Sequence, residues 1–188
     1  MNIGNDFYGK IKRAIGKRKS ADQGFGRIGS GCEILKGSHF IFPERTRIGC
    51  FVHIESGAFL HAQGGINIHD HAILGPGVVI LTSTHRHRGA RLVPYDEVDL
   101  LCPVTIERAA WIGMRAMILP GVTVAEGSIL GAGAVLTKSF PAGSILGGNP
   151  AVVIGQRDMD SYHKCILDNS FYLKTKKELD LKKIEQVC

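Results

Sequence analysis

Branched aliphatic side chains recur at every sixth position in the second half of this chain. A period of six is neither the 3.6 of an α-helix nor the 2 of a strand. It is typical of a chain that turns a corner every six residues and points one side chain inward from each side. We therefore expect an all-β solenoid, a parallel β-helix of hexapeptide repeats, with about 18 residues in each three-sided coil. The positions in this register are Ile106, Ile112, Ile118, Val124, Leu130 and Leu136.

The same period runs through the first half of the chain, in shorter runs. The register shifts by two residues between Phe40 and Phe42 and again between Ile66 and Ile68, which is expected where a corner bulges. Together the runs predict a solenoid over residues 28–156. Their members are Ile28, Ile34 and Phe40; then Phe42, Ile48, Ile54, Leu60 and Ile66; then Ile68, Leu74 and Ile80.

The period breaks once, between Ile80 and Ile106. The interval 81–103 is polar and contains two histidines, His85 and His87, among several charged residues. A long excursion from a rigid scaffold is the usual place for function, because the scaffold holds still the residues that the loop carries outward. We expect the catalytic loop here.

Both flanks of the solenoid differ from it in charge or pattern. Residues 1–27 hold seven of the Lys and Arg residues against two Asp, and Ile3, Phe7, Ile11 and Ile15 lie four apart within them. This pattern predicts a basic amphipathic helix and a linker; the helix either packs on the solenoid or contacts an anionic membrane surface. Residues 157–188 predict a C-terminal helical segment that covers the open end of the solenoid.

Cysteine usage and hydropathy indicate the compartment. The five cysteines are scattered and form no CxxC pair, so reduced thiols in a cytoplasmic protein are expected. The sequence has no apolar run of about 20 residues and no signal-peptide pattern. The expected location is the cytoplasm, at the inner face of the membrane if the N-terminal helix binds lipid. No nucleic-acid motif accompanies the basic charge, so no nucleic-acid partner is expected.

Five short motifs follow one another in the stretch from Val104 to Arg157: Trp111-Ile112-Gly113, Ile118-Leu119-Pro120-Gly121-Val122, Gly131-Ala132-Gly133, Thr137-Lys138 and Gly148-Asn149-Pro150-Ala151. On these motifs the stretch resembles the left-handed β-helix acetyltransferases. The resemblance is to the maltose, galactoside and xenobiotic acetyltransferases and to the O-acetyltransferases of polysaccharide biosynthesis, and it covers roughly 28–157.

This resemblance implies a left-handed coil and an acetyl-CoA-dependent O-acetyltransferase. The acceptor it implies is a sugar hydroxyl in a surface polysaccharide or glycolipid precursor; the alternative is a small diffusible acceptor, either a free sugar or an antibiotic. It also implies a homotrimer that binds the coenzyme A thioester between subunits, with no metal.

The resemblance assigns roles to individual residues. His85 matches the family's general base, since a neutral imidazole can take the proton of an attacking hydroxyl. His87, Trp111 and Asp96 are expected to bind substrate, and His87 is also the rival candidate for the base. Three carboxylates of the loop either bind acceptor hydroxyls or pair with its arginines: Asp96, Glu97 and Asp99 with Arg86, Arg88 and Arg91. The residues expected to bind the cofactor are Gly113, Gly131, Ala132, Thr137, Lys138, Pro150 and Arg157.

Two other classes of function compete with acetyl transfer. A metal enzyme of the γ-carbonic-anhydrase kind would hold zinc with imidazoles from facing coils. The candidates are His53, His61, His69, His71, His85 and His87, but no stretch resembles that family's ligand pattern. A non-catalytic binding solenoid is the third class, and it would not need the excursion at 81–103.

Overall fold

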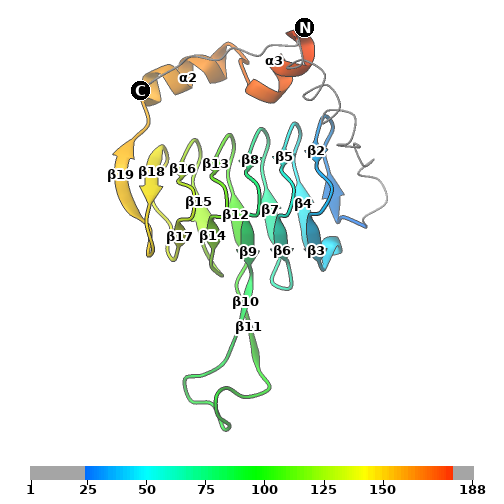
Figure 1. Cartoon of the computed structure of the whole chain (residues 1–188), viewed down its shortest axis with the longest axis vertical. Coiled ribbons are helices and arrows are strands. Elements are labelled where there is room, and N and C mark those ends of the chain that lie inside the picture. Colours follow the sequence, from blue (N-terminus) through cyan, green and yellow to red (C-terminus); the bar gives the residue numbers. More distant parts are fainter. Residues whose placement is uncertain (1–23, 180–188) are drawn as a thin grey trace, which may run out of the picture.

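The computed structural model describes residues 24–179, which form a three-sided parallel β-solenoid (Figure 1). We call its sides face A, face B and face C. Each face is a parallel sheet that gains one short strand per coil, except that the last strand of face B runs antiparallel. Face A comprises β1 (Arg27–Ile28), β4 (Thr46–Ile48), β7 (Ile66–Ile68), β12 (Val104–Ile106) and β15 (Thr123–Val124). Face B comprises β2 (Glu33–Ile34), β5 (His53–Ile54), β8 (Ile73–Leu74), β13 (Trp111–Ile112), β16 (Ile129–Leu130), β18 (Ser144–Gly147) and β19 (Val152–Gln156). Face C comprises β3 (His39–Ile41), β6 (Phe59–His61), β9 (Val79–Leu81), β14 (Met117–Ile118) and β17 (Val135–Leu136).

The inward ladder forms the core, as the period of six predicted. All six aliphatics from Ile106 to Leu136 are at most 1% exposed, and residues in the same register stack directly, as Ile112 does between Leu74 and Leu130. Each buried aliphatic contributes about 1.5–3 kcal/mol of transfer free energy relative to an exposed one. The core is therefore a column of aliphatic layers that runs the length of the solenoid.

The two shifts of register lie at one corner of the solenoid, where face C turns into face A. The 3-10 helix η2 (Pro43–Arg45) occupies this corner in one coil, and Gly64-Gly65 occupies it in the next. The interval 81–103, which breaks the period, leaves from the same corner as an arm. Its base is a two-stranded antiparallel ribbon, β10 (Ser83–His85) and β11 (Asp99–Leu101), which projects from the solenoid (Figure 1).

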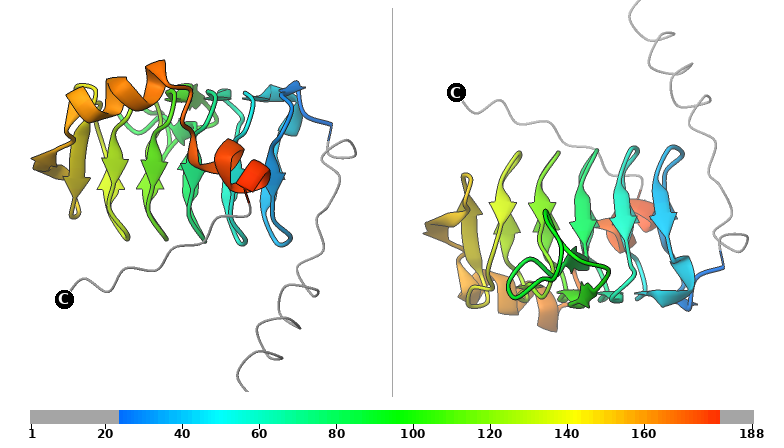
Figure 2. Two further views of the ribbon diagram at one scale, coloured as in Figure 1. Left: turned by 90° about the horizontal axis from the view of Figure 1, so that it is seen from above. Right: turned by 90° about the horizontal axis from the view of Figure 1, so that it is seen from below.

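The C-terminal helices do not cover the end of the solenoid, so that expectation was wrong. The end is closed by β19, which turns back and pairs antiparallel with β18. The helices α2 (Met159–Leu167) and α3 (Tyr172–Leu179) then run back along the solenoid, on the side opposite the arm (Figure 2). Their apolar residues Tyr162 and Leu173 are 7% and 3% exposed, because the corner between faces A and B offers them a long surface to pack on.

The basic helix expected over residues 1–27 lies almost wholly outside the described residues, which begin at Gly24. Between residues 24 and 179, no helix has both the length and the hydropathy that crossing a bilayer requires.

Candidate active site

The arm places a carboxylate directly opposite His85. In the antiparallel ribbon, His85 on β10 is the register partner of Asp99 on β11. The two side chains meet, with His85 Nδ1 2.8 Å from Asp99 Oδ1. An ionised carboxylate can only accept a hydrogen bond, so Nδ1 carries the proton of a neutral imidazole here. Nε2 is then the unprotonated nitrogen and can act as a base.

The ring of His85 is also held from its face. It stacks on Tyr95, with ring centroids 3.9 Å apart and an interplanar angle of 8°. The imidazole remains about half exposed, at 51%, so a substrate can reach it. One hydrogen bond and one stacked ring thus fix the direction of the imidazole while leaving Nε2 accessible.

A residue of the solenoid itself supports this pair. Gln63, at the corner of the preceding coil, donates from Nε2 to Asp99 Oδ2 at 2.9 Å. This hydrogen bond and the neighbouring His85 hold the pKa of the Asp99 carboxyl below its usual value. Asp99 therefore stays ionised at neutral pH, and the chain Gln63–Asp99–His85 links the arm to the rigid scaffold.

Asp96 does not face the solvent, which contradicts its expected role in binding the acceptor. Its side chain is fully buried and accepts from Nε of Arg86 at 2.8 and 3.1 Å, and from the backbone N–H groups of Arg91 and Val98. The hydrogen bond from Arg86 holds the pKa of Asp96 below its usual value. A buried carboxylate is costly unless it is paired and hydrogen-bonded. Asp96 therefore stabilises the interior of the arm and does not bind a substrate.

Trp111 lies on another side of the solenoid than His85, whereas His87 follows His85 on the arm by two positions. The side chain of His87 is exposed on the arm, beyond the antiparallel ribbon. Trp111 lies on β13 of face B, between Ile73 and Ile129 in register, and is 52% exposed. The arm leaves from the corner between faces C and A, so it and Trp111 occupy different sides of the solenoid.

The residues expected to bind the cofactor are spread over three edges. Gly113, Gly131 and Ala132 stack at the corner between faces B and C, and Gly148-Asn149-Pro150-Ala151 lies beside β17, which begins there. Thr137 and Lys138 follow β17 at the corner between faces C and A, with the ammonium of Lys138 over the Phe140 ring. Arg157 is separate: its Nε donates to the carbonyl of Gly127 at 2.6 Å, at the corner between faces A and B.

The glycine at position 113 is required by the coil itself. A Cβ there would lie 2.6 Å from the backbone nitrogen of Ala132 and 2.8 Å from the carbonyl oxygen of Leu130, far inside contact distance. Its presence is therefore explained by coil stacking, whatever else binds there.

The histidines of the solenoid do not converge. Within residues 24–179, no three His, Cys, Asp or Glu side chains form an arrangement that could hold a metal ion. His53 is bound by carboxylates on both ring nitrogens, to Glu33 at 3.1 Å and Glu55 at 2.8 Å, and His71 is stacked between Phe51 and Phe171. The donor set offers no support to the carbonic-anhydrase alternative.

Comparison with known proteins assigns the chain to a family. Residues 103–138 match the model of the bacterial transferase hexapeptide, described as six repeats. The chain is 30% identical over 148 residues to the galactoside O-acetyltransferase of Lactococcus lactis, a match that covers 73% of this chain and 68% of that protein. The chain belongs to the hexapeptide-repeat acetyltransferases.

Other members of the family are also similar to this hexapeptide-repeat acetyltransferase. A putative colanic acid biosynthesis acetyltransferase of Escherichia coli is 27% identical over 131 residues, covering 70% of this chain and 69% of that protein. A putative acetyltransferase of Schizosaccharomyces pombe is 39% identical over 92 residues, but the match spans only 41% of that protein and 46% of this chain. The crystal structure of a Vibrio cholerae hexapeptide-repeat acetyltransferase in complex with acetyl-CoA has a TM-score of 0.64 at 23% identity, covering 83% of this chain and 79% of that one. This likeness identifies the fold as the left-handed hexapeptide β-helix.

The sequence does not single out Asp99 or Gln63 as the support of His85. The sequence predicts for Asp99 a contact with the acceptor or with an arginine, and Gln63 carries no motif. The signal that could have found Asp99 is the symmetry of the arm, since a ribbon that leaves and re-enters at one corner pairs its two ends.

Proposed function

We propose that this protein is an acetyl-CoA-dependent O-acetyltransferase that acetylates a sugar hydroxyl in a surface polysaccharide or glycolipid precursor. The observation that carries the proposal is the supported histidine, His85, held by Asp99 and Gln63 on an arm that leaves a rigid solenoid. The colanic acid biosynthesis relative and the galactoside O-acetyltransferase relative support a glycan acceptor.

In the proposed reaction His85 acts as the general base. Its Nε2 takes the proton of the acceptor hydroxyl while the oxygen attacks the thioester carbonyl, and Asp99 stabilises the imidazolium that forms. The carbon–oxygen bond forms, the carbon–sulfur bond breaks, and the proton on Nε2 passes to the leaving thiolate of coenzyme A. The products are the acetyl ester and free coenzyme A.

The coenzyme A thioester is proposed to lie along the C-terminal coils. Gly113, Gly131 and Ala132 form a low, side-chain-poor edge where a pantetheine arm can approach the backbone. Lys138 and Thr137 are exposed at the far side of face C, where an ammonium can meet a phosphate. The acetyl-CoA complex of the Vibrio cholerae protein supports this choice of co-substrate.

A homotrimer is proposed because one face of the solenoid presents apolar side chains outward, whereas another presents polar and charged ones. Face C presents an apolar ladder, Phe59, Val79 and Met117 in register, whereas face A presents Arg27, Arg47 and Asn67. An apolar sheet face is suited to an interface between copies. In a trimer, the arm of one copy can bring His85 to a face of the next.

The test is acetyl transfer by the purified full chain. Acetyl-CoA is mixed with a panel of free sugars, alkyl and aryl glycosides, and aminoglycosides, and the thiol released is measured. We expect turnover with at least one glycoside, and His85→Ala should lower kcat by about 10²–10⁴-fold with little change in acetyl-CoA binding. A His85→Ala enzyme with the parent's kcat would refute the proposed base, and light scattering that shows an active monomer would refute the trimer.

A further inference from the structure

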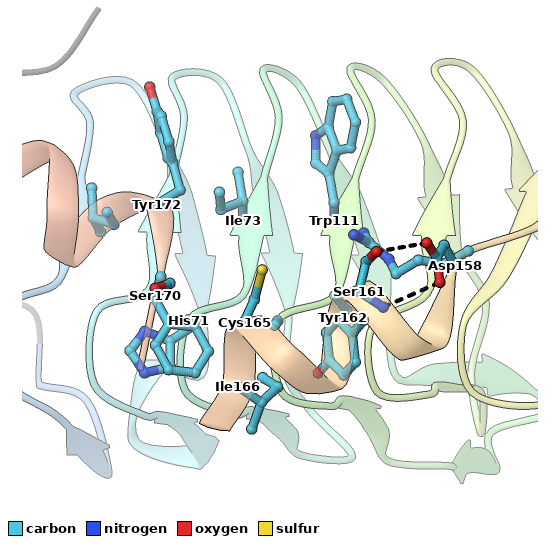
Figure 3. Close-up of a pocket in the computed structure, with 15 residues that line it drawn as sticks. His71, Ile73, Trp111, Asp158, Ser161, Tyr162, Cys165, Ile166, Ser170 and Tyr172 are labelled. Carbon is cyan, nitrogen blue, oxygen red and sulfur yellow. Dashed lines mark hydrogen bonds between the residues drawn. The ribbon is translucent and has the colours of Figure 1, made fainter. Parts of the chain in front are cut away.

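Each face of the solenoid presents a different kind of side chain outward. The helices α2 and α3 lie over face B, where Ile73 and Trp111 line a cavity beneath them (Figure 3). Face C carries the apolar ladder described above. On face A one residue of each strand points outward, and every one of these side chains can donate a hydrogen bond. They are Arg27, Arg47, Asn67, Thr105 and Thr123, which stack in register from β1 to β15.

These donors have no partner within the part of the chain that the structure describes. Between residues 24 and 179, none of the five side chains makes a hydrogen bond, an ion pair or a ring contact. Arg27 and Arg47 are exposed and are direct register partners on neighbouring strands, about 4.8 Å apart. Like charges directly opposite each other destabilise a sheet, so the stability of the solenoid does not explain this pair.

A hollow of about 310 Å³ lies beside the two arginines, on the side of face A that turns into face B. Arg27, Arg47 and Asn67 line it from face A, and His69 and Arg108 line it from the corner. Its volume is at the lower end of the range for small-molecule sites. The two unpaired guanidinium groups therefore border a concave surface that a small ligand can enter.

The carboxylates near this hollow are already engaged. Asp70, which is part of the lining, accepts from the backbone N–H of Cys50 at 2.7 Å. Glu126 accepts from Nε of Arg108 at 3.0 Å and from the hydroxyl of Tyr162 at 2.9 Å. Glu126 thus offsets the charge of Arg108, whereas the charges of Arg27 and Arg47 have no carboxylate within ion-pair distance. The hollow keeps an excess of positive charge.

A second copy of the chain does not supply the missing acceptors. Face C is apolar along its ladder, and the outward carboxylate of face B, Glu33, is bound to His53 at 3.1 Å. Face A against itself would set arginines against arginines. The occupant that complements the column is a small anion with several oxygen atoms.

We propose that Arg27 and Arg47 form a binding site for a phosphate group, with Asn67 as a further donor from the next coil. A carboxylate has two oxygens and satisfies one guanidinium fork, whereas a phosphate has enough oxygens to bridge two forks on adjacent strands. The site lies on the first coils of the solenoid, at the opposite end from Lys138 and Gly131. It is therefore separate from the edge proposed for coenzyme A, and it goes beyond the proposed reaction.

The first measurement is isothermal titration of the full chain with phosphate, pyrophosphate and acetate at equal ionic strength. Phosphate and pyrophosphate should bind, and acetate should bind more weakly. Arg27→Gln and Arg47→Gln should each raise the Kd for pyrophosphate at least about tenfold, since each removes a charge-assisted contact. Lys36→Gln is the matched control, because it removes the same charge from an exposed turn between β2 and β3 and should leave the Kd unchanged. Circular dichroism checks that each variant folds.

The second measurement distinguishes a free phosphate ligand from a lipid headgroup. The same four proteins are sedimented with vesicles of phosphatidylglycerol and phosphatidylcholine in equal parts, and with vesicles of phosphatidylcholine alone. A loss of pyrophosphate binding in the two arginine variants, with vesicle binding equal to that of Lys36→Gln, assigns the site to a free phosphate ligand. A loss of binding to the anionic vesicles in the arginine variants alone assigns it to a headgroup.

The proposal is overturned if both arginine variants bind phosphate, pyrophosphate and vesicles as the Lys36→Gln control does. Neither measurement depends on acetyl transfer. Failure of the phosphate site therefore leaves the proposed function standing, and failure of the proposed function leaves the phosphate site standing.

Discussion

Replacing Asp99 with Asn is the sharpest test of the supported histidine. The carboxylate of Asp99 accepts on both sides, from Gln63 Nε2 at 2.9 Å and from His85 Nδ1 at 2.8 Å. An amide has one accepting oxygen and one donating nitrogen. As long as Gln63 keeps its donating NH₂ toward position 99, Asp99→Asn sets its own NH₂ against one of two donors. If it faces His85, the imidazole accepts at Nδ1 and carries its proton on Nε2, which is the wrong tautomer for a base.

The size of the effect follows from the exposure of the pair. Complete loss of a general base costs about 10²–10⁴-fold in rate. His85 and Asp99 are 51% and 40% exposed, so water can partly replace the lost carboxylate, and the Tyr95 ring still holds the imidazole face. We therefore expect Asp99→Asn to lower kcat about 10–100-fold, with the KM for acetyl-CoA unchanged.

The assay is steady-state release of coenzyme A from the parent, Asp99→Asn, Gln63→Ala and the double variant. Gln63→Ala alone should cost less, because it leaves the carboxylate on His85. In the double variant the Asn oxygen is free to accept from His85, so part of the lost rate should return, and the two changes should not add. An Asp99→Asn enzyme that turns over at the parent rate would refute this account of the site.

Three further predictions address other residues. His87→Ala should raise the KM of the acceptor and leave kcat near the parent value in steady-state kinetics; if it instead abolishes turnover while His85→Ala does not, the base is His87. Lys138→Glu should raise the KM for acetyl-CoA by about tenfold or more through loss of a phosphate contact, and an unaltered KM would exclude that contact. Burial and the hydrogen bond to Glu126 raise the pKa of Tyr162 to about 12. The folded protein therefore holds this proton more tightly than the unfolded chain, so the stabilisation of α2 is complete below pH ~10 and is lost as the pH rises toward 12. The fluorescence of Trp111, the sole tryptophan, should report this loosening; an identical pH profile in Tyr162→Phe would assign the change to another group.

The solenoid could be predicted from the sequence because one rule governs every coil. A six-residue period needs only local information, and every sixth residue from Ile106 to Leu136 is at most 1% exposed. The two register shifts were also readable, at Phe40/Phe42 and Ile66/Ile68, since each marks the same corner. Even the arm was marked, as a break in the period.

The interior of the arm could not be predicted in the same way. The arm is irregular, so no repeating pattern in the sequence predicts its conformation. That conformation decides which arginine pairs with Asp96, out of Arg86, Arg88 and Arg91. The partnership of His85 and Asp99 requires the register of a ribbon whose ends lie 14 positions apart, together with Gln63 from a preceding coil. The position of the C-terminal helices was predicted wrongly for a similar reason. Their sequence shows an apolar stripe, but it does not show which surface of the solenoid that stripe packs against.

The arm leaves and re-enters the solenoid without disturbing a single layer. On either side of it, Ile66 pairs with Val104 and Ile80 with Ile118 in the same register that every other coil keeps. Because the ends of the arm are fixed by the coils, lengthening it costs little, about 0.6 kcal/mol for a doubling of its length. The segment between Leu81 and Val104 can therefore be exchanged for that of a relative while the coils on either side keep their pairing. During evolution the sequence of the arm, and with it the chemistry of this enzyme, can change faster than the sequence of the solenoid core.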